Sequence, residues 1–285
     1  MRVRRVILPD DRVAVESLLA RAADRDGYAP LSEEAQVAFD LESGDAGWVV
    51  VNSGRIDGFA HRRVHRDSAV FELAVVGDAA RAAADLLTQA IRGGGAGTQV
   101  RIWVSDPDAA AAVQAAGASF GRRLIRLQRP LPVGAPALAE GIRIAPFRMP
   151  VDVGAYLIVA NDAFADHPES SAWTRATFIE RCGRSWFDAN GLFMAWDRGR
   201  PVGACWTKLR SGGVGEIYSV AVRPSAAARG LGRALVLTGF GYLAERRGAG
   251  IGMLWADRAN EAAVRLYGHL GMVTVRERTE LLLEA

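Results

Sequence analysis

The stretch EIYSVAVRPSAAARGLGRALV, residues 216–236, joins a predicted strand to a predicted helix. Apolar residues alternate over 214–222, as in a strand, and follow helical spacing from about 229 to 247. Gly230 and Gly232 allow the backbone to turn tightly and to come close to a ligand. The helix that begins there presents unpaired N–H groups and its positive dipole end, so the junction favours an anion such as a pyrophosphate.

Two familiar phosphate-binding loops do not fit this junction. The loop of nucleotide hydrolases requires GKS or GKT, and the sequence has no lysine near Gly230. The dinucleotide fingerprint requires GxGxxG after the first strand of its domain. A glycine-containing helix start that binds nothing remains an alternative interpretation.

The residues around the junction predict an α/β (α+β) domain. The expected elements are strands at 142–146, 192–196, 201–209 and 273–283, a strand ending near Trp255, and helices at 151–165, 173–183 and 261–270. Hairpin-linked strands followed by β-α-β-α-β units indicate a largely antiparallel front and a parallel junction.

The first half of the chain repeats this order. Trp103 closes an apolar strand, an alanine-rich helical stretch follows, and an alternating strand covers 120–129. A segment rich in proline and glycine, residues 128–141, divides the halves. We therefore predict an internal duplication with two tandem domains, residues 1–135 and 136–285, each a mixed central sheet flanked by helices.

Composition narrows the functional classes. The 285-residue chain has a formal charge of +3 without a long basic block, which argues against a nucleic-acid partner. Its N-terminus lacks the apolar stretch of a signal peptide, and no apolar run approaches the roughly 20 residues of a membrane helix. Cys182 and Cys205 fit neither a disulfide framework nor a metal site. We therefore expect a cytoplasmic protein that binds no membrane and no metal.

The basic residues are distributed unevenly by type and position. Of 35 basic residues, 35 − 1 = 34 are arginines, and Lys208 is the sole lysine. The densest basic stretch is 61–66, and alternation on a strand would divide its side chains between two faces. We expect this stretch to be a solvated hairpin.

The junction resembles the acetyl-CoA loop of the GCN5-related N-acetyltransferases, whose pattern is Q/R-x-x-G-x-G/A. Both glycines match, whereas Ala227 replaces the first polar residue. Family members pair the preceding strand with the pantetheine arm and aim one N–H at the thioester oxygen, and NEAAVRLYGHLGM (260–272) resembles a later family segment. The resemblance implies acetyl-CoA contacts from Val220, Ala221, Val222, Ala227, Ala228, Arg229, Gly230, Leu231, Gly232, Arg233, Asn260 and Arg265.

A closer resemblance covers nearly the whole second half. The segments NDAFADHPESSAWT (161–174), SWFDANGLFMAW (185–196), ACWTKL (204–209) and GEIYSVAV (215–222) occur in the order typical of the mycothiol synthase family of tandem acetyltransferases. Members of that family acetylate the cysteine amine of cysteinyl-glucosaminyl-inositol. The resemblance implies the same direct transfer from acetyl-CoA here.

The same resemblance assigns roles to individual residues. Glu216 would be the general base and Tyr267 the general acid. A carboxylate can take the proton of an incoming ammonium, and a phenol can supply one to a departing thiolate. The implied substrate contacts are Glu33, Glu169, Lys208, Glu216 and Trp255, the last in place of a tyrosine common in the family. Taken singly, a solvated carboxylate and a packed tyrosine are the ordinary alternatives.

The first half lacks the features of a working acetyl-CoA loop. Within FELAVVGDAARAAADLL (71–87), Ala83 and Asp85 occupy the glycine positions. Alanine resists conformations open to glycine, and a carboxylate would repel a pyrophosphate. We expect this domain to be degenerate and structural.

Other interpretations of the whole chain stay open. The fold could act on another amine, such as an aminoglycoside, a polyamine or a protein N-terminus. It could also be a non-catalytic acyl-CoA-binding module. In every case we expect a monomer.

Calorimetric titration with acetyl-CoA is expected to give about one site per chain, because the first half lacks the glycines of the loop. A stoichiometry of two would contradict the interpretation of residues 77–85.

Overall fold

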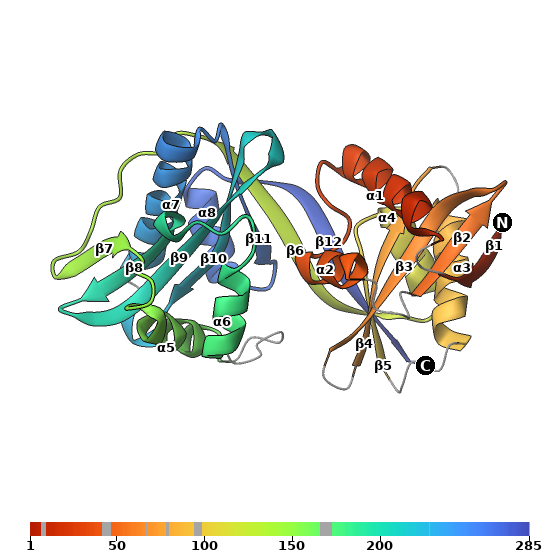
Figure 1. The fold of residues 1–285 in the computed structure, drawn as a ribbon, viewed down its shortest axis with the longest axis horizontal. Coiled ribbons are helices and arrows are strands. Elements are labelled where there is room, and N and C mark those ends of the chain that lie inside the picture. Colours follow the sequence, from red (N-terminus) through yellow and green to blue (C-terminus); the bar gives the residue numbers. More distant parts are fainter. Residues whose placement is uncertain are drawn as a thin grey trace. The chain divides into compact units, whose positions relative to one another are not determined.

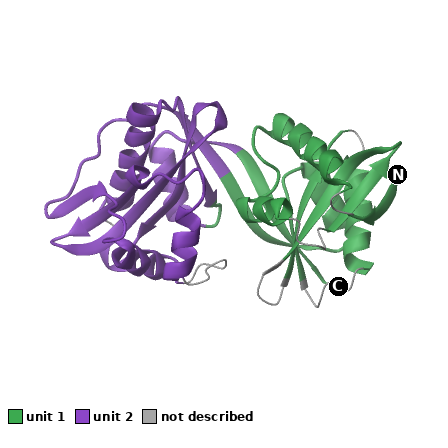
Figure 2. Cartoon of the chain, viewed as in Figure 1, with its two compact units in different colours: residues 1–125, 257–259, 276–285 green, residues 126–256, 260–275 purple. Residues whose placement is uncertain are grey.

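The computed structural model describes residues 1–6, 10–41, 47–65, 68–77, 80–93, 99–165, 173–227 and 229–284. The chain forms two compact units, coloured separately in Figure 2. Unit 1 contains Met1–Ile125, Asp257–Ala259 and Arg276–Ala285, and unit 2 contains Arg126–Ala256 and Asn260–Val275.

Unit 1 is a mixed sheet with helices on both faces. Its elements are β1 (Arg2–Arg5), α1 (Arg12–Asp26), α2 (Glu33–Asp40), β2 (Gly47–Asn52), β3 (Arg55–His65), β4 (Ser68–Val75), α3 (Ala80–Gly93), β5 (Gln99–Val104), α4 (Pro107–Ala115) and the start of β6 (Ser119–Pro130). The strand order is β1-β2-β3-β4-β5-β12, and β4 pairs with β5 in parallel. One core contains Leu18 of α1 and Phe39 of α2, and the other contains Leu87 of α3 and Ala109 of α4.

Unit 2 repeats this order of elements, as Figure 1 shows along its colour gradient. Its elements are β7 (Ile142–Pro146), α5 (Val153–Ala163), α6 (Arg175–Cys182), β8 (Leu192–Asp197), β9 (Arg200–Arg210), β10 (Val214–Val222), α7 (Leu231–Arg247), β11 (Ile251–Asp257), α8 (Glu261–His269) and the start of β12 (Val273–Glu284). The strand order is β6-β11-β10-β9-β8-β7. The predicted duplication and the α/β fold class are therefore confirmed.

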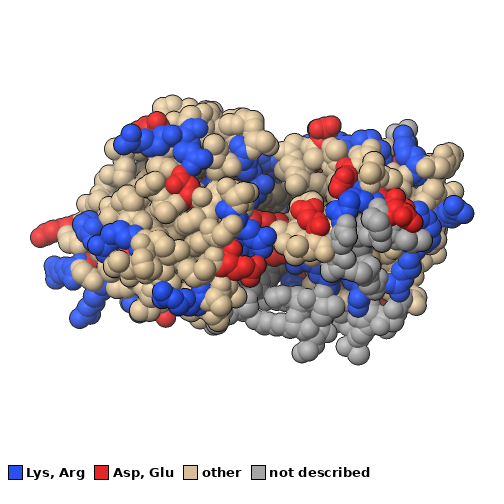
Figure 3. All heavy atoms as spheres, viewed as in Figure 1, with Lys and Arg blue, Asp and Glu red and all other residues tan. Residues whose placement is uncertain are grey.

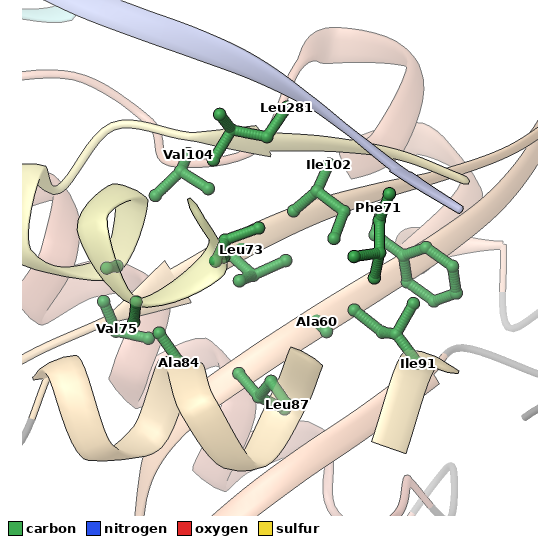
Figure 4. Packing of buried hydrophobic residues seen from close by; sticks show 14 of the residues in the cluster. Ala60, Phe71, Leu73, Val75, Ala84, Leu87, Ile91, Ile102, Val104 and Leu281 are labelled. Carbon is green, nitrogen blue, oxygen red and sulfur yellow. The ribbon is translucent and has the colours of Figure 1, made fainter. Parts of the chain in front are cut away.

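The last strand of the chain belongs to the first unit. From Thr279 to Glu284, β12 pairs antiparallel with β5. Leu281 and Leu283 are fully buried in the unit 1 core, where Figure 4 shows Leu281 beside Ile102 and Val104. In turn, β6 begins in unit 1 and continues into unit 2 from Arg126 onward. Each repeat thus contributes its final strand to the other unit.

Helix α7 packs closely on the sheet of unit 2. A Cβ at Gly239 would lie 2.7 Å from Ile217 Cδ1 and 2.9 Å from Cys205 Sγ. A Cβ at Gly203 would lie 2.8 Å from Leu235 Cδ1. Glycine at these contacts lets α7 approach β9 and β10, and this approach fixes where α7 begins.

The drawn surface carries both basic and acidic side chains, as the nearly balanced charge of the sequence indicates. On the face drawn in Figure 3, basic and acidic side chains are interspersed over each unit. Within the part of the chain that the structure describes, no helix is both long and apolar enough to cross a bilayer.

The expectation that residues 61–66 form a solvated hairpin is wrong for His61. Strands β3 and β4 do pair as a hairpin, but His61 is 1% exposed. Its ring packs 5.8 Å from that of Phe59 and 6.3 Å from that of Phe39. Burial lowers the pKa of His61 to about 4, so the imidazole is neutral in the core. The side chain at position 61 lies on the face of the sheet that α1 and α2 cover. The density of basic residues in the stretch did not indicate this burial.

Glu72 of β4 is a buried acidic centre of unit 1. It is 1% exposed and accepts hydrogen bonds from the backbone N and Oγ of Ser32, both at 2.6 Å. Arg63 donates to it at 2.6 Å and Arg278 at 2.7 Å. Burial opposes the charge, but the two guanidinium groups outweigh it and the pKa of Glu72 falls to about 2. The carboxylate therefore joins the start of α2, strand β3 and strand β12.

Glu72→Ala is expected to lower the free energy of unfolding by roughly 3–5 kcal/mol, because it leaves Arg63 and Arg278 without their buried carboxylate. The folded pKa lies below the ordinary value of 4.5, so this stabilisation is present above that pH and is lost as the pH falls toward about 2. Urea unfolding at pH 7 and pH 3 measures the effect, and the gap between wild type and variant should narrow at pH 3.

The matched control for this change is Glu16→Ala on α1. Glu16 is an exposed partner of Arg12 at 3.8 Å. Its loss should change the free energy of unfolding by less than about 0.5 kcal/mol. Equal losses in the two variants would contradict a central role for Glu72.

Candidate functional site

Strands β10 and β11 pair over only part of their length. Their parallel ladder joins Val214–Glu216 to Ile251–Met253. On its other edge, β10 stays paired with β9 as far as Val222. Among the described residues, the backbone groups of 217–222 on the edge toward β11 are therefore not paired with β11. An extended ligand can hydrogen-bond to such an edge as an added strand does.

The open edge leads into the start of α7. After Val222, a short 3-10 turn (Pro224–Ala226) brings the chain to Gly230, whose φ of 71° lies in the left-handed region. Gly230 is the N-cap, so α7 begins at Leu231, slightly later than the sequence pattern indicated. The first intrahelical bond runs from Ala234 N to Gly230 O at 3.0 Å. The N–H groups before Ala234 thus have no intrahelical acceptor and can bind an anion.

Helix α8 lies against this helix start. A Cβ at Gly232 would lie 3.5 Å from Leu266 Cδ2 of α8 and 3.9 Å from Val222 Cγ2 of β10. The next residue of α8, Tyr267, is 5% exposed. Burial raises the pKa of Tyr267 to about 12, with a contribution from Cys205 of β9. The phenol is therefore protonated throughout the neutral range.

Three of the predicted acetyl-CoA contacts have partners within the protein. Arg229 forms an ion pair with Asp197, and Arg265 pairs with Glu261 at 2.9 Å. The Oδ1 atom of Asn260 accepts from Ala263 N at 3.1 Å and caps α8. These contacts orient the side chains around the helix starts, and their roles toward a ligand stay predictions.

Glu216 and Lys208 face each other across β10 and β9. Directly paired residues project to the same face of a sheet, so both side chains lie on the face opposite α7. Glu216 is 4% exposed and accepts a hydrogen bond from Arg210 Nε at 2.7 Å. The predicted base is thus buried, held by an arginine and one strand away from the sole lysine.

Aromatic side chains line the same face. Trp206 of β9 is 1% exposed, and its ring centroid lies 5.8 Å from that of Trp186 and 5.6 Å from that of Tyr218. Among the described residues, its Nε1 has no hydrogen-bond partner. Arg181 of α6 donates to the Tyr218 hydroxyl. We call Trp186, Trp206 and Tyr218 the aromatic wall.

The remaining predicted site residues either lie outside the described part of the chain or are at least partly exposed. Ala228 and Glu169 lie outside the described residues. Trp255 on β11 is partly exposed, and Arg233 is exposed on the first turn of α7. Glu33 begins α2 in unit 1 and is partly exposed. In the described parts of the chain, no three histidine, cysteine, aspartate or glutamate side chains gather as a metal site would require.

Besides Trp206 of the aromatic wall, four residues of the site were not predicted from the sequence. They are Arg181, Trp186, Arg210 and Tyr218. Arg210 follows Lys208 by two residues on a strand, so the alternation of the strand could have indicated it. The other three meet only through folding, because Trp186 lies between elements and Tyr218 lies at an irregularity of β10.

The corresponding junction in unit 1 has a different backbone. Helix α3 begins at Ala80, so Ala83 lies inside its first turn and is fully buried. A Cβ at Gly58 would lie 3.2 Å from the Ala83 Cβ. Asp85 follows, partly exposed, on the same helix. In unit 2 the left-handed Gly230 is the N-cap of α7, whereas in unit 1 the left-handed Gly77 lies three residues before α3 and buried alanines fill the first turn of α3.

Known proteins match both the second half of the chain and the chain as a whole. The model of the acetyltransferase (GNAT) family matches residues 158–272. A GCN5-related N-acetyltransferase from Sphaerobacter thermophilus has a similar fold, with a TM-score of 0.73 over 99% of this chain and 95% of that one, at 24% identity. A tandem GNAT protein from the clavulanic acid biosynthesis pathway matches with a TM-score of 0.70 over 99% and 98% of the two chains, at 18% identity.

Several curated relatives match over almost their full length. The mycothiol acetyltransferase of Thermobispora bispora is 39% identical over 92% of both chains. That of Mycobacterium sp. (strain JLS) is 34% identical over 94% of this chain and 93% of its own. With an open β10 edge, a glycine-capped helix and two tandem units, this chain belongs to the mycothiol acetyltransferase family of GNAT enzymes.

Proposed function

We propose that this chain transfers the acetyl group of acetyl-CoA to the cysteine amine of cysteinyl-glucosaminyl-inositol, giving mycothiol and CoA. The relatives named mycothiol acetyltransferase support the substrate, and the open edge of β10 beside the α7 start supports the donor. At neutral pH the amine enters as an ammonium. Forming the amide and breaking the thioester then releases CoA as a thiol and one net proton.

The donor would be held largely by backbone groups. The unpaired edge of 217–222 suits the amides of the pantetheine arm, and the first N–H groups of α7 suit the pyrophosphate. Ala227 supplies no side-chain contact, but its substitution leaves these N–H donors in place. An N–H on the same edge would stabilise the oxyanion as the amine attacks the thioester.

Glu216 would take the proton of the ammonium, directly or through one water. Its burial keeps competing water away, and its pairing with Arg210 Nε at 2.7 Å holds one carboxylate oxygen in a defined orientation. The second oxygen is then the natural acceptor for the substrate proton.

Tyr267 would assist the departing thiolate. Because its pKa is raised to about 12, the phenol is always available as a hydrogen-bond donor near neutral pH. An ordinary thiol such as that of CoA has a pKa of about 8.5, so the phenol stabilises the thiolate chiefly by donating a hydrogen bond. Any proton it does release returns from the amine nitrogen as the amide forms.

The two predicted domains would have unequal roles. The catalytic part would be the second, residues 136–285, with its C-terminal strand seated in unit 1. The first, residues 1–135, would be structural, since Ala83 is packed inside a helix where an acetyl-CoA loop would need glycine. The free cysteines Cys182 and Cys205 fit a reducing cytosol, and we propose that the enzyme acts there as a monomer.

Purified enzyme with acetyl-CoA is expected to acetylate cysteinyl-glucosaminyl-inositol with a higher kcat/KM than cysteamine or an aminoglycoside. Release of the CoA thiol, followed with a thiol reagent after correction for the substrate thiol, measures the rate. A preference for the aminoglycoside would indicate another amine. Binding of acetyl-CoA without turnover of any amine would indicate a non-catalytic module.

Glu216→Gln is expected to lower kcat by about 10²–10⁴-fold, since it removes the general base. Tyr267→Phe should lower kcat by a smaller factor, because it removes one hydrogen bond to the thiolate. Both variants should keep the acetyl-CoA affinity within about twofold by calorimetry, and their melting curves serve as the folding control. Full turnover in both would rule out the assigned roles.

A further inference from the structure

The ammonium group of Lys208 lies over aromatic rings. Its Nζ is 4.3 Å from the ring centroid of Trp186 and 5.7 Å from that of Tyr218. A cation over an aromatic face is attracted by the ring quadrupole. Because a lysine side chain has many rotamers, contacts with two rings restrict the directions in which its N–H groups point.

Tyr218 reaches this position through an irregularity in β10. The pairing with β9 shifts between Ile217 and Ser219, so Tyr218 is the extra residue of a bulge. A bulge redirects the side chain at that point of a strand. The ring of Tyr218 then lies 4.8 Å from that of Trp186, and its hydroxyl accepts a hydrogen bond from Arg181.

The aromatic wall is anchored in the core of unit 2 through its buried member, Trp206. Trp186 lies 5.8 Å from the fully buried Trp206, measured between ring centroids. Trp206 in turn contacts Phe178 at 5.6 Å and Phe187 at 5.5 Å. The rings are therefore held by packing and define a rigid surface for the lysine.

We propose that Trp186 and Tyr218 are positioning residues that aim the Lys208 ammonium at the hydroxyl-rich part of the amine substrate, an inference that rests on the proposed function. Lys208 faces Glu216 directly across the strand pair. An ammonium donates to hydroxyl oxygens, while the carboxylate receives the proton of the reacting amine. The rings thus set the distance between the group that recognises the sugar and the group that activates the amine.

Trp186→Leu is expected to raise the KM for cysteinyl-glucosaminyl-inositol by about tenfold, since it removes the closer of the two cation–π contacts. The kcat and the KM for acetyl-CoA should stay within about twofold, because the change acts on the ring that packs against Lys208, Trp206 and Tyr218 and leaves Glu216 and the start of α7 in place. Trp186→Phe, which keeps a ring face, should restore most of the affinity. Trp196→Leu is the matched control, since Trp196 lies beside Arg143 instead.

A double-mutant cycle tests whether Trp186 acts through the lysine. In a Lys208→Met background, Trp186→Leu should change the KM by less than about twofold, because the cation it positions is gone. If the two substitutions instead multiply their separate effects, Trp186 contacts the substrate by itself and the proposal is overturned.

Because Lys208 is the sole lysine of the chain, its geometry can be observed without any substrate. In protein labelled with ¹³C-lysine, the ring currents of Trp186 should shift the Lys208 Cε protons upfield from their free position. Trp186→Leu should remove most of that upfield shift, and Trp196→Leu should leave the shift unchanged. An unshifted wild-type resonance would overturn the inference even if the enzyme makes mycothiol. A shifted resonance in an enzyme inactive on that amine would overturn only the proposed function.

Discussion

The separation of β10 from β11 after Glu216 is the constraint on which the site depends. A strand inside a sheet has its backbone groups paired on both edges, and such a strand has nothing to offer a ligand. Here the β9 side keeps β10 in place as far as Val222, while among the described residues β11 pairs with β10 only as far as Glu216. The same segment therefore supports the fold on one edge and leaves the backbone groups of its other edge available to a ligand.

Close packing places the start of α7 next to the open edge of β10. Gly203 and Gly239 let α7 approach the strands, and Gly232 brings the end of β10 and α8 together at one point. Consequently the open edge, the first helical N–H groups and Tyr267 belong to one continuous region. The acidic and basic groups occupy the opposite face, where the aromatic wall supports Lys208 beside Glu216.

The duplicated fold shows how one order of elements accommodates two different helix starts. Both units place a helix between two parallel strands and have a left-handed glycine ahead of it, but Gly230 is the N-cap of α7 whereas Gly77 lies three residues before α3, whose first turn is packed with alanines. Unit 1 also contains the buried Glu72, which forms ion pairs with two arginines, one of them on β12. That contact fastens the C-terminal strand into the first unit, so the first repeat contributes to the integrity of the chain.

The sequence by itself determined the elements and the chemistry of the junction. Periods of two and 3.6 residues are local properties, so the strand at 214–222, the helix after Gly230 and the repeat of both halves could be predicted. Glu216 and Lys208 lie on the predicted strands 214–222 and 201–209, and the structure pairs these two residues directly. Only the tertiary structure decided the exchange of β6 and β12, the burial of His61 and the bulge that turns Tyr218 toward Lys208. These depend on pairing and packing between residues far apart in the chain, and no local pattern records which distant surface a strand will meet.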